Sequence, residues 1–113
     1  MIDLDMIEAI VAQYSKHSWD LRRILLGAES FSALSELLAS KYSKVEIRNA
    51  VINAIWFSRP NGDAESWELR RIDGLPYALV RVIPNSAERD EREGILNAAE
   101  IEIDAKQSTV RGH

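Results

Sequence analysis

Apolar side chains recur at intervals of three and four residues in several stretches of the chain, the spacing of an amphipathic helix. This pattern predicts helices over residues 5–16, 34–40, 44–58 and 85–105. Two later runs, residues 67–72 and 77–83, have the pattern of β-strands instead. Because Asp73 and Gly74 stand between these runs, we expect a β-hairpin there.

The segment from Tyr42 to Ile47 contains the clearest local signal of the chain. Ser43 can accept a hydrogen bond from an early helical amide, and Glu46 can accept one from the backbone amide of the cap residue, as in the capping box of a helix start. The apolar residues at the two ends of the segment can pack together across that start. Since this start closely follows the helix expected at 34–40, the pattern predicts a helix-turn-helix.

Residues 19–26 allow two interpretations. The run 18–24 nearly repeats the run 66–72, so a strand in the later copy favours a strand in the earlier one. The leucine and isoleucine spacing also fits a helical period, and Gly27 would end such a helix. The sequence leaves strand and helix open.

In the order of its predicted elements, the chain resembles the winged helix-turn-helix superfamily over residues 5–83. Residues 34–40 match the positioning helix, 44–58 the recognition helix and 67–83 the wing. The resemblance implies an α+β fold with a three-helix core, a β-hairpin wing and an additional C-terminal helix. It also implies that the recognition helix enters the major groove of DNA and that the terminal helix supports a homodimer.

The length of 113 residues suits one compact core and no more. We expect a winged-helix-like domain at residues 1–84, a candidate dimerisation helix at 85–105 and a frayed tail at 106–113. No apolar run approaches the roughly 20 residues that span a membrane, and the N-terminus lacks the features of a signal peptide. The absence of cysteine excludes disulfides and fits a reducing compartment, so we expect a cytoplasmic protein.

The net charge of −4 argues against a protein that coats nucleic acid through bulk electrostatics. Residues 1–40 carry three Lys or Arg against six Asp or Glu, a balance of −3. Residues 84–113 carry four against seven, again −3, whereas residues 41–83 carry seven against five, a balance of +2. The only positive third therefore contains the predicted recognition helix and wing.

The outward face of the predicted recognition helix carries side chains that suit duplex DNA. Asn49 and Asn53 would lie one turn apart, where each could make two hydrogen bonds with adenine. Basic residues of this helix suit phosphate or guanine, and wing arginines suit phosphate unless they only balance nearby carboxylates. These features predict a small non-enzymatic DNA-binding protein of the transcription-regulator type. The candidate DNA contacts are Lys44, Arg48, Asn49, Asn53, Arg70 and Arg71.

The same predicted helix also carries large apolar side chains, and the C-terminal helix has an apolar stripe. Either set is covered within the chain or it forms a contact surface for a protein. The alternative function is therefore a protein-interaction or oligomerisation module that does not bind nucleic acid. The candidate partner contacts are Val45, Ile52, Trp56, Ile95, Leu96, Ala99 and Ile103.

The sequence offers little for catalysis. His17 and His113 have no metal ligand beside them in the sequence, and without cysteine the common zinc spacings are absent. Phosphate-binding glycine loops and the nucleophile elbow of hydrolases are also missing. We therefore expect no enzymatic activity, no cofactor and no metal.

Overall fold

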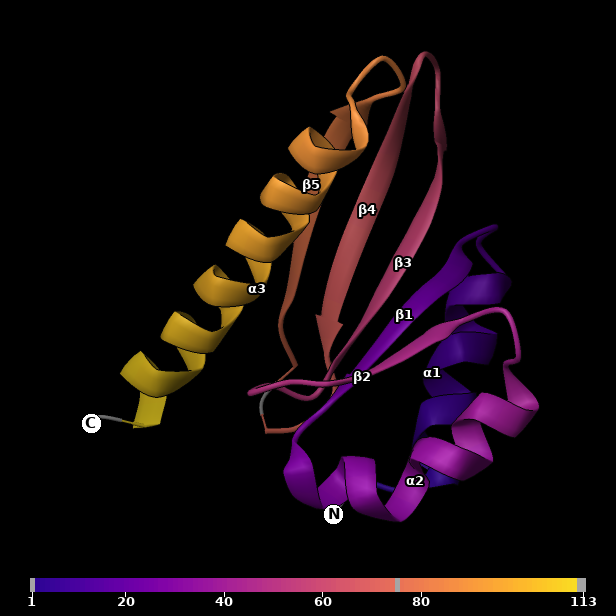
Figure 1. Ribbon diagram of the computed structural model, residues 1–113, viewed down its shortest axis with the longest axis vertical. Helices are drawn as coiled ribbons and strands as arrows, with labels where there is room; N and C mark the ends of the chain where they lie inside the picture. Colours follow the sequence, from indigo (N-terminus) through magenta and orange to yellow (C-terminus); the bar gives the residue numbers. More distant parts are fainter. Residues whose placement is uncertain (1, 75, 112–113) are drawn as a thin grey trace.

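The computed structural model describes residues 2–74 and 76–111 of the chain. It contains a five-stranded sheet with the strand order β2-β1-β3-β4-β5, in which β1 and β2 are parallel and the other neighbours antiparallel (Figure 1). In chain order, the elements are α1 (Leu4–Ser15), β1 (Asp20–Leu26), α2 (Ala28–Lys41), β2 (Glu46–Asn49), β3 (Ala54–Asn61), β4 (Ala64–Arg71), β5 (Ala78–Pro84) and α3 (Arg89–Arg111).

Helices cover both faces of the sheet, which gives two apolar cores. On one face, Ile7 of α1 and Leu34 of α2 pack with sheet residues such as Ile55. On the other face, α3 contributes Leu96 and its neighbours to a core that includes both Trp56 and Trp67. The central strand β3 supplies side chains to both cores, because successive strand residues point to opposite faces.

The helix predicted over residues 44–58 is wrong, because this segment contains β2, a turn and β3. Residues 54–58 of β3 are all buried, since the sheet has helices on both sides. A strand buried on both faces loses the alternation of apolar and polar side chains. Its continuous apolar run then fits a helical period as well as an extended one.

The predicted winged-helix fold is wrong for the same reason. The two strands expected as a wing are β4 and β5, and they belong to a five-stranded sheet rather than to a hairpin on a three-helix core. The presumed helix start at Ser43 is a turn, in which the Val45 amide donates to the Tyr42 carbonyl at 3.0 Å. The fold is α+β, but its centre is the sheet.

Other predicted elements are confirmed. The helix expected at 5–16 is α1, whose first turn is capped by Asp3 accepting from the Met6 amide at 2.8 Å. Residues 19–26, for which the sequence leaves strand and helix open, contain strand β1. The helix expected at 34–40 is the second part of α2. The C-terminal helix begins later than expected and continues through the predicted tail to Arg111, while residues 112–113 lie outside the described residues. None of the described helices is long and apolar enough to cross a membrane.

Candidate functional site

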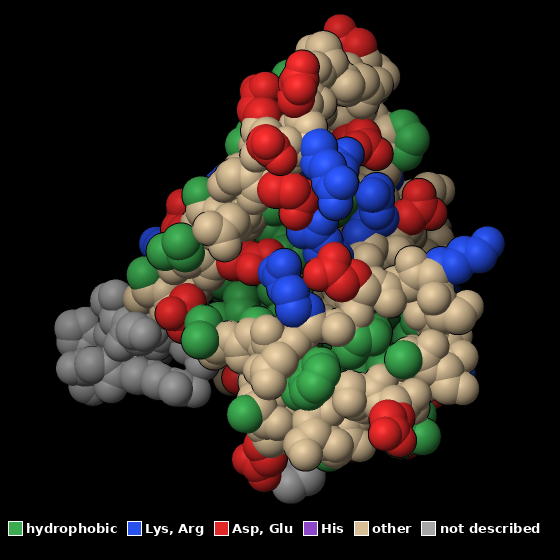
Figure 2. Space-filling model, viewed as in Figure 1, with side chains coloured by type: hydrophobic (Ala, Val, Ile, Leu, Met, Phe, Trp, Pro, Cys, Tyr) green, Lys and Arg blue, Asp and Glu red, His purple; other side chains and the backbone are tan. Residues whose placement is uncertain are grey.

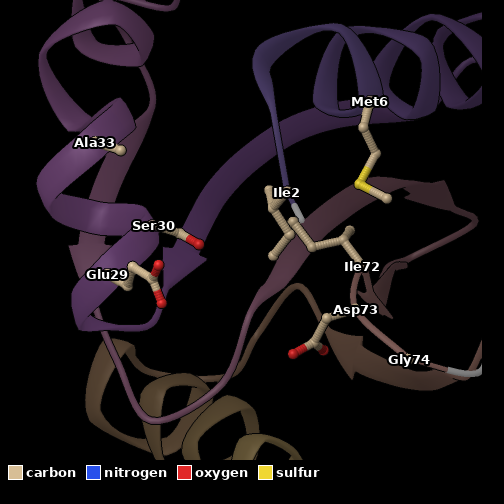
Figure 3. A pocket seen from close by; sticks show the side chains of 8 residues that line it. All are labelled: Ile2, Met6, Glu29, Ser30, Ala33, Ile72, Asp73 and Gly74. Carbon is tan, nitrogen blue, oxygen red and sulfur yellow. The ribbon is translucent and has the colours of Figure 1, made fainter.

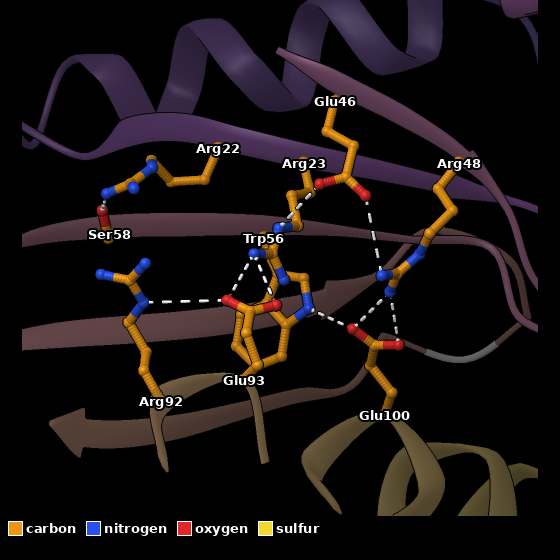
Figure 4. A network of polar contacts seen from close by, with 9 residues as sticks. All are labelled: Arg22, Arg23, Glu46, Arg48, Trp56, Ser58, Arg92, Glu93 and Glu100. Carbon is orange, nitrogen blue, oxygen red and sulfur yellow. Dashed lines mark hydrogen bonds and ion pairs between the residues drawn. The ribbon is translucent and has the colours of Figure 1, made fainter. Parts of the chain in front are cut away.

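A row of charged side chains lies between α3 and strands β1 to β3, and one end of it is hollowed into a pocket. Basic and acidic side chains gather along it on the face shown in Figure 2. We call it the arginine groove and define it by Arg22, Arg23, Glu46, Arg48, Trp56, Ser58, Arg92, Glu93 and Glu100 (Figure 4). A pocket of about 280 Å³ lies at the Arg48 end, beside Asn97 and Ile101 of α3.

A β-bulge in β1 places two adjacent arginines in this groove. The pairing of β1 with β3 shifts between Leu21 and Arg23, so Arg22 is an extra residue in the strand. Neighbouring residues of a regular strand point to opposite faces, whereas here Arg22 bonds to Ser58 and Arg23 reaches α3 on the same face. The bulge therefore doubles the positive charge at one position of the groove.

Arg23 is held by two carboxylates. Its Nη2 donates to Glu93 Oε1 at 2.9 Å and to Glu93 Oε2 at 2.7 Å, and its Nε lies 3.3 Å from Glu46 Oε1. The hydrogen bonds from Arg23 lower the pKa of the Glu93 carboxyl below its ordinary value of 4.5, although partial burial works against this shift. Glu93 therefore stays ionised and ties α3 to β1.

Arg48 is held in a similar way one strand further out. Its Nη2 donates to both carboxylate oxygens of Glu100, at 2.7 and 2.8 Å, and the indole N–H of Trp56 donates to the same carboxylate at 2.8 Å. Glu93 and Glu100 are seven residues apart, about two helical turns, so both project from one side of α3. Two arginines of the groove, Arg23 and Arg48, are thus already paired with carboxylates of the chain itself.

The other two arginines have no such close carboxylate among the described residues. Arg22 donates to Ser58 Oγ at 2.9 Å and lies over the Trp67 ring at 4.4 Å, but its nearest carboxylate oxygen, on Glu65, is 3.8 Å away. The Arg92 guanidinium approaches a carboxylate, that of Glu93, only to 3.7 Å. The two side chains are 37% and 34% exposed.

Figure 4 draws the guanidinium groups of Arg22 and Arg92 at the same end of the arginine groove, Arg22 bonded to Ser58 and Arg92 beside Glu93. A guanidinium offers several N–H donors in a planar fork that matches carboxylate and phosphate oxygens. Two partly exposed forks beside a hydroxyl can therefore bind an anionic group. This pair is the part of the groove with unused hydrogen-bonding capacity.

A second pocket, of about 420 Å³, lies on the opposite side of the sheet (Figure 3). It is bordered by the N-terminal ends of α1 and α2 and by the segment after β4, and its lining is mostly apolar, with Met6 and Ile72. Asp73 contributes a carboxylate that also accepts from Asn53 Nδ2 at 3.1 Å. The lining residues are Ile2, Met6, Glu29, Ser30, Ala33, Ile72, Asp73 and Gly74.

The predicted DNA contacts do not form one surface. Arg48 lies in the arginine groove and Asn49 borders the pocket at the same end, whereas Lys44 lies in the turn before β2. Asn53 bonds within the chain to Gly27 and Asp73. In β4, Arg71 is buried on the α3 face and Arg70 is half-buried on the opposite face. The recognition-helix arrangement that would have united them is absent from residues 44–58.

Most of the predicted partner contacts lie in the interior. Ile52 and Trp56 are buried in the core beneath α3, and Val45 packs against the core on the other face. The α3 stripe of Leu96, Ala99 and Ile103 packs on the sheet, with Ile95 at its margin. The structure thus places these side chains in contacts within the chain.

Sequence reasoning did not select the residues that form the arginine groove, apart from Arg48 and Trp56. In the sequence, Arg22 and Arg23 stand out only as part of the run 18–24 that resembles 66–72. Two adjacent arginines inside a strand give no clear signal of the bulge, because the adjacent pair Arg70 and Arg71 in β4 has a regular register. The α3 glutamates gave no signal, since alternating charge is ordinary on a helix surface.

The part of the chain that the structure describes contains no group of three or more His, Asp or Glu side chains able to hold a metal ion. Comparison with known proteins matches no protein-family model, no curated protein and no solved structure.

Proposed function

We propose that this protein is a non-enzymatic protein-binding module, in which the arginine groove binds carboxylate groups of an acidic segment of a partner. The observation that carries the proposal is the pair of guanidinium groups of Arg22 and Arg92 beside Ser58, with no carboxylate closer than 3.7 Å among the described residues.

The occupied half of the groove supports a carboxylate as the ligand group. Arg23 and Arg48 each hold both oxygens of a glutamate at 2.7 to 2.9 Å. Such two-bond contacts are stronger and more selective than single ion pairs. A partner carboxylate at Arg22 and Arg92 would repeat, between two chains, the contact that the groove already makes within one.

The surroundings of the arginine pair favour an acidic peptide over duplex DNA. Glu46, Glu65 and Glu93 lie along the groove, and they would repel the closely spaced phosphates of a duplex. A peptide can place a few carboxylates at the arginines and other side chains near the glutamates. Binding to duplex DNA stays a prediction that the same experiment tests.

The experiment is a titration followed by NMR of the tryptophan indole N–H signals. Hexaglutamate peptide, inorganic phosphate and a short DNA duplex are added in turn at low salt. Trp67 lies under Arg22, whereas Trp19 lies in the core on the other face, so the peptide should shift the Trp67 signal and leave that of Trp19 in place. The double variant Arg22→Gln, Arg92→Gln should weaken peptide binding by at least about tenfold.

The control is Arg81→Gln, which removes an arginine that pairs with Glu102 of α3 outside the arginine groove. It should leave peptide affinity within about twofold. Binding of the duplex but not the peptide, with the same dependence on Arg22 and Arg92, would replace this proposal by the DNA-binding function. No binding of any probe would mean that the groove serves only to hold α3 in place, and the proposal would be wrong.

A further inference from the structure

Strand β5 is the last strand of the sheet, and no described strand pairs with its outer edge. At one end of its pairing with β4, the Arg71 amide donates to the Tyr77 carbonyl at 2.9 Å. At the other end, the Asn85 amide donates to the Asp63 carbonyl at 3.0 Å. In an antiparallel ladder every second residue faces its neighbour strand, so residues 77, 79, 81, 83 and 85 face β4.

It follows that the backbone N–H and C=O groups of Ala78, Val80 and Val82 face outward. The next outward positions on either side are Pro76 and Pro84, which have no N–H to donate. The free edge is therefore a segment with three outward amides between two prolines, and Val80 lies at its midpoint. The Val80 carbonyl also accepts from Arg81 Nη1 at 2.9 Å, which leaves it a second lone pair.

The side chains of this edge are unusually apolar for an exposed strand. Val80 and Val82 are 48% and 58% exposed, on the face of β5 that α3 does not cover. The opposite edge strand, β2, has only four residues and carries Glu46 and Arg48. Short length and charge protect an edge against pairing with another chain, whereas a longer edge with exposed valines invites it.

We infer that β5 pairs with β5 of a second copy of this chain, so that two five-stranded sheets join into one continuous sheet about a two-fold axis at Val80. Val80 then faces Val80 of the second copy, and Ala78 faces Val82 of the second copy. Every outward N–H and C=O between the prolines gains a partner, and the prolines face one another at the two ends. The contact is isologous and closed, as in most homodimers.

The charges on the strand distinguish this register from the next one. With the axis at Val80, the guanidinium of Arg81 lies across from the apolar Leu79 of the second copy. Moving the axis by one residue, to Arg81, would place Arg81 directly opposite Arg81 of the second copy, where like charges repel. It would also pair Ala78 with Pro84, which cannot donate to the Ala78 carbonyl. Arg81 keeps its ion pair with Glu102 of α3, at 2.9 Å, in the favoured register.

Single cysteine variants test the register, because the natural chain has no cysteine. In a hydrogen-bonded antiparallel pair the Cα atoms are about 5.5 Å apart, within the range that a disulfide spans. Val80→Cys should therefore form a covalent dimer under mild oxidation, read on a non-reducing gel. Val82→Cys lies on the same strand with similar exposure, but the two copies of residue 82 would be far apart, so it should remain largely unlinked.

The mass of the protein in solution tests the dimer itself. Sedimentation should give twice the mass of one chain for the wild type and a single chain for Val80→Arg, with circular dichroism showing that the variant is folded. Val51→Arg is the matched control, since Val51 is 86% exposed and lies far from β5 in the loop between β2 and β3; it should remain dimeric. A monomeric wild type, a dimer that survives Val80→Arg, or equal cross-linking of Val80→Cys and Val82→Cys would overturn the inference.

Discussion

Asn53 joins three parts of the chain through one side-chain amide. Its Oδ1 accepts from the Gly27 amide at 2.8 Å, and its Nδ2 donates to Asp73 Oδ2 at 3.1 Å. Gly27 precedes α2 and has no side chain that could cap the helix. Asn53 therefore fixes the start of α2 and the segment after β4 in one network.

Replacing Asn53 by alanine should lower the free energy of unfolding by about 1 to 3 kcal/mol, because two partly buried groups lose their partner. Asn49→Ala is the control, since Asn49 is exposed, and its effect should stay within about 0.5 kcal/mol. Urea denaturation of both variants measures the difference. Equal effects would show that the amide network contributes no stability.

The sequence could identify Asn49 and Asn53 as polar residues at regular spacing, but not distinguish their roles. The partners of Asn53 are 26 and 20 residues away, so they depend on how the whole sheet is assembled. The pair of Arg22 and Arg92 could not be predicted for the same reason, because the Ser58 hydroxyl that Arg22 contacts is 36 residues away in the sequence. Local patterns carry no information about such distant contacts.

At the scale of elements, α3 is held to the sheet in two ways. Its apolar stripe packs over β4 and β5, and its glutamates reach sideways to β1 and β2. The ion pair of Glu93 and Arg23 should contribute to stability only while the Glu93 carboxylate is charged. Arg23 is 14% exposed, so water screens this pair less than it would a pair on the open surface.

The stabilising contribution of Glu93 should therefore depend on pH. Its pKa is lowered in the folded protein, so the contribution is fully present above the ordinary value of 4.5 and is lost as pH falls through the folded pKa. The difference in unfolding free energy between wild type and Glu93→Gln should be constant from pH 7 to about 5 and shrink below that. Denaturation curves at several pH values measure it, with Glu91→Gln, an exposed glutamate of α3, as the control.

Elements with one exposed face were predictable, and those buried on both faces were not. The helices α1 and α3 and the strands β4 and β5 show clear local patterns, because each keeps one side that is exposed or only partly buried. Strand β3 is central, with both neighbours paired and both faces covered. Because the helix predicted over residues 44–58 covered both β3 and β2, the prediction missed two of the five strands and therefore the sheet that defines the fold.

At the scale of the whole molecule, the two cores share the central strands. Strands β1 and β3 send alternate residues, such as Leu25 and Ile24, into opposite cores. We expected a domain at 1–84 and a separate helix at 85–105. If that helix were not packed on the sheet, the core beneath α3 would be uncovered. Trp56, Trp67 and Leu69 would then be exposed on one face of the sheet.

A chain that ends at Pro84 should therefore fail to form a compact native state. Removing α3 would expose an apolar surface that no other described element covers, and the remaining core would have to support the sheet alone. We expect loss of cooperative thermal unfolding and strong binding of a hydrophobic dye. A truncated chain that unfolds cooperatively and binds no dye would support the division into an independent domain.

The extra residue in β1 serves the arginine groove rather than the sheet. Leu21 is opposite Phe57 and Arg23 is opposite Trp56, so deleting Arg22 would restore a regular alternation with every other side chain of the strand on its present face. Leu21 would stay with the core beneath α1. Loss of this one residue during evolution should therefore preserve the fold and remove an arginine from the groove, whereas replacing the arginine by another residue keeps the bulge.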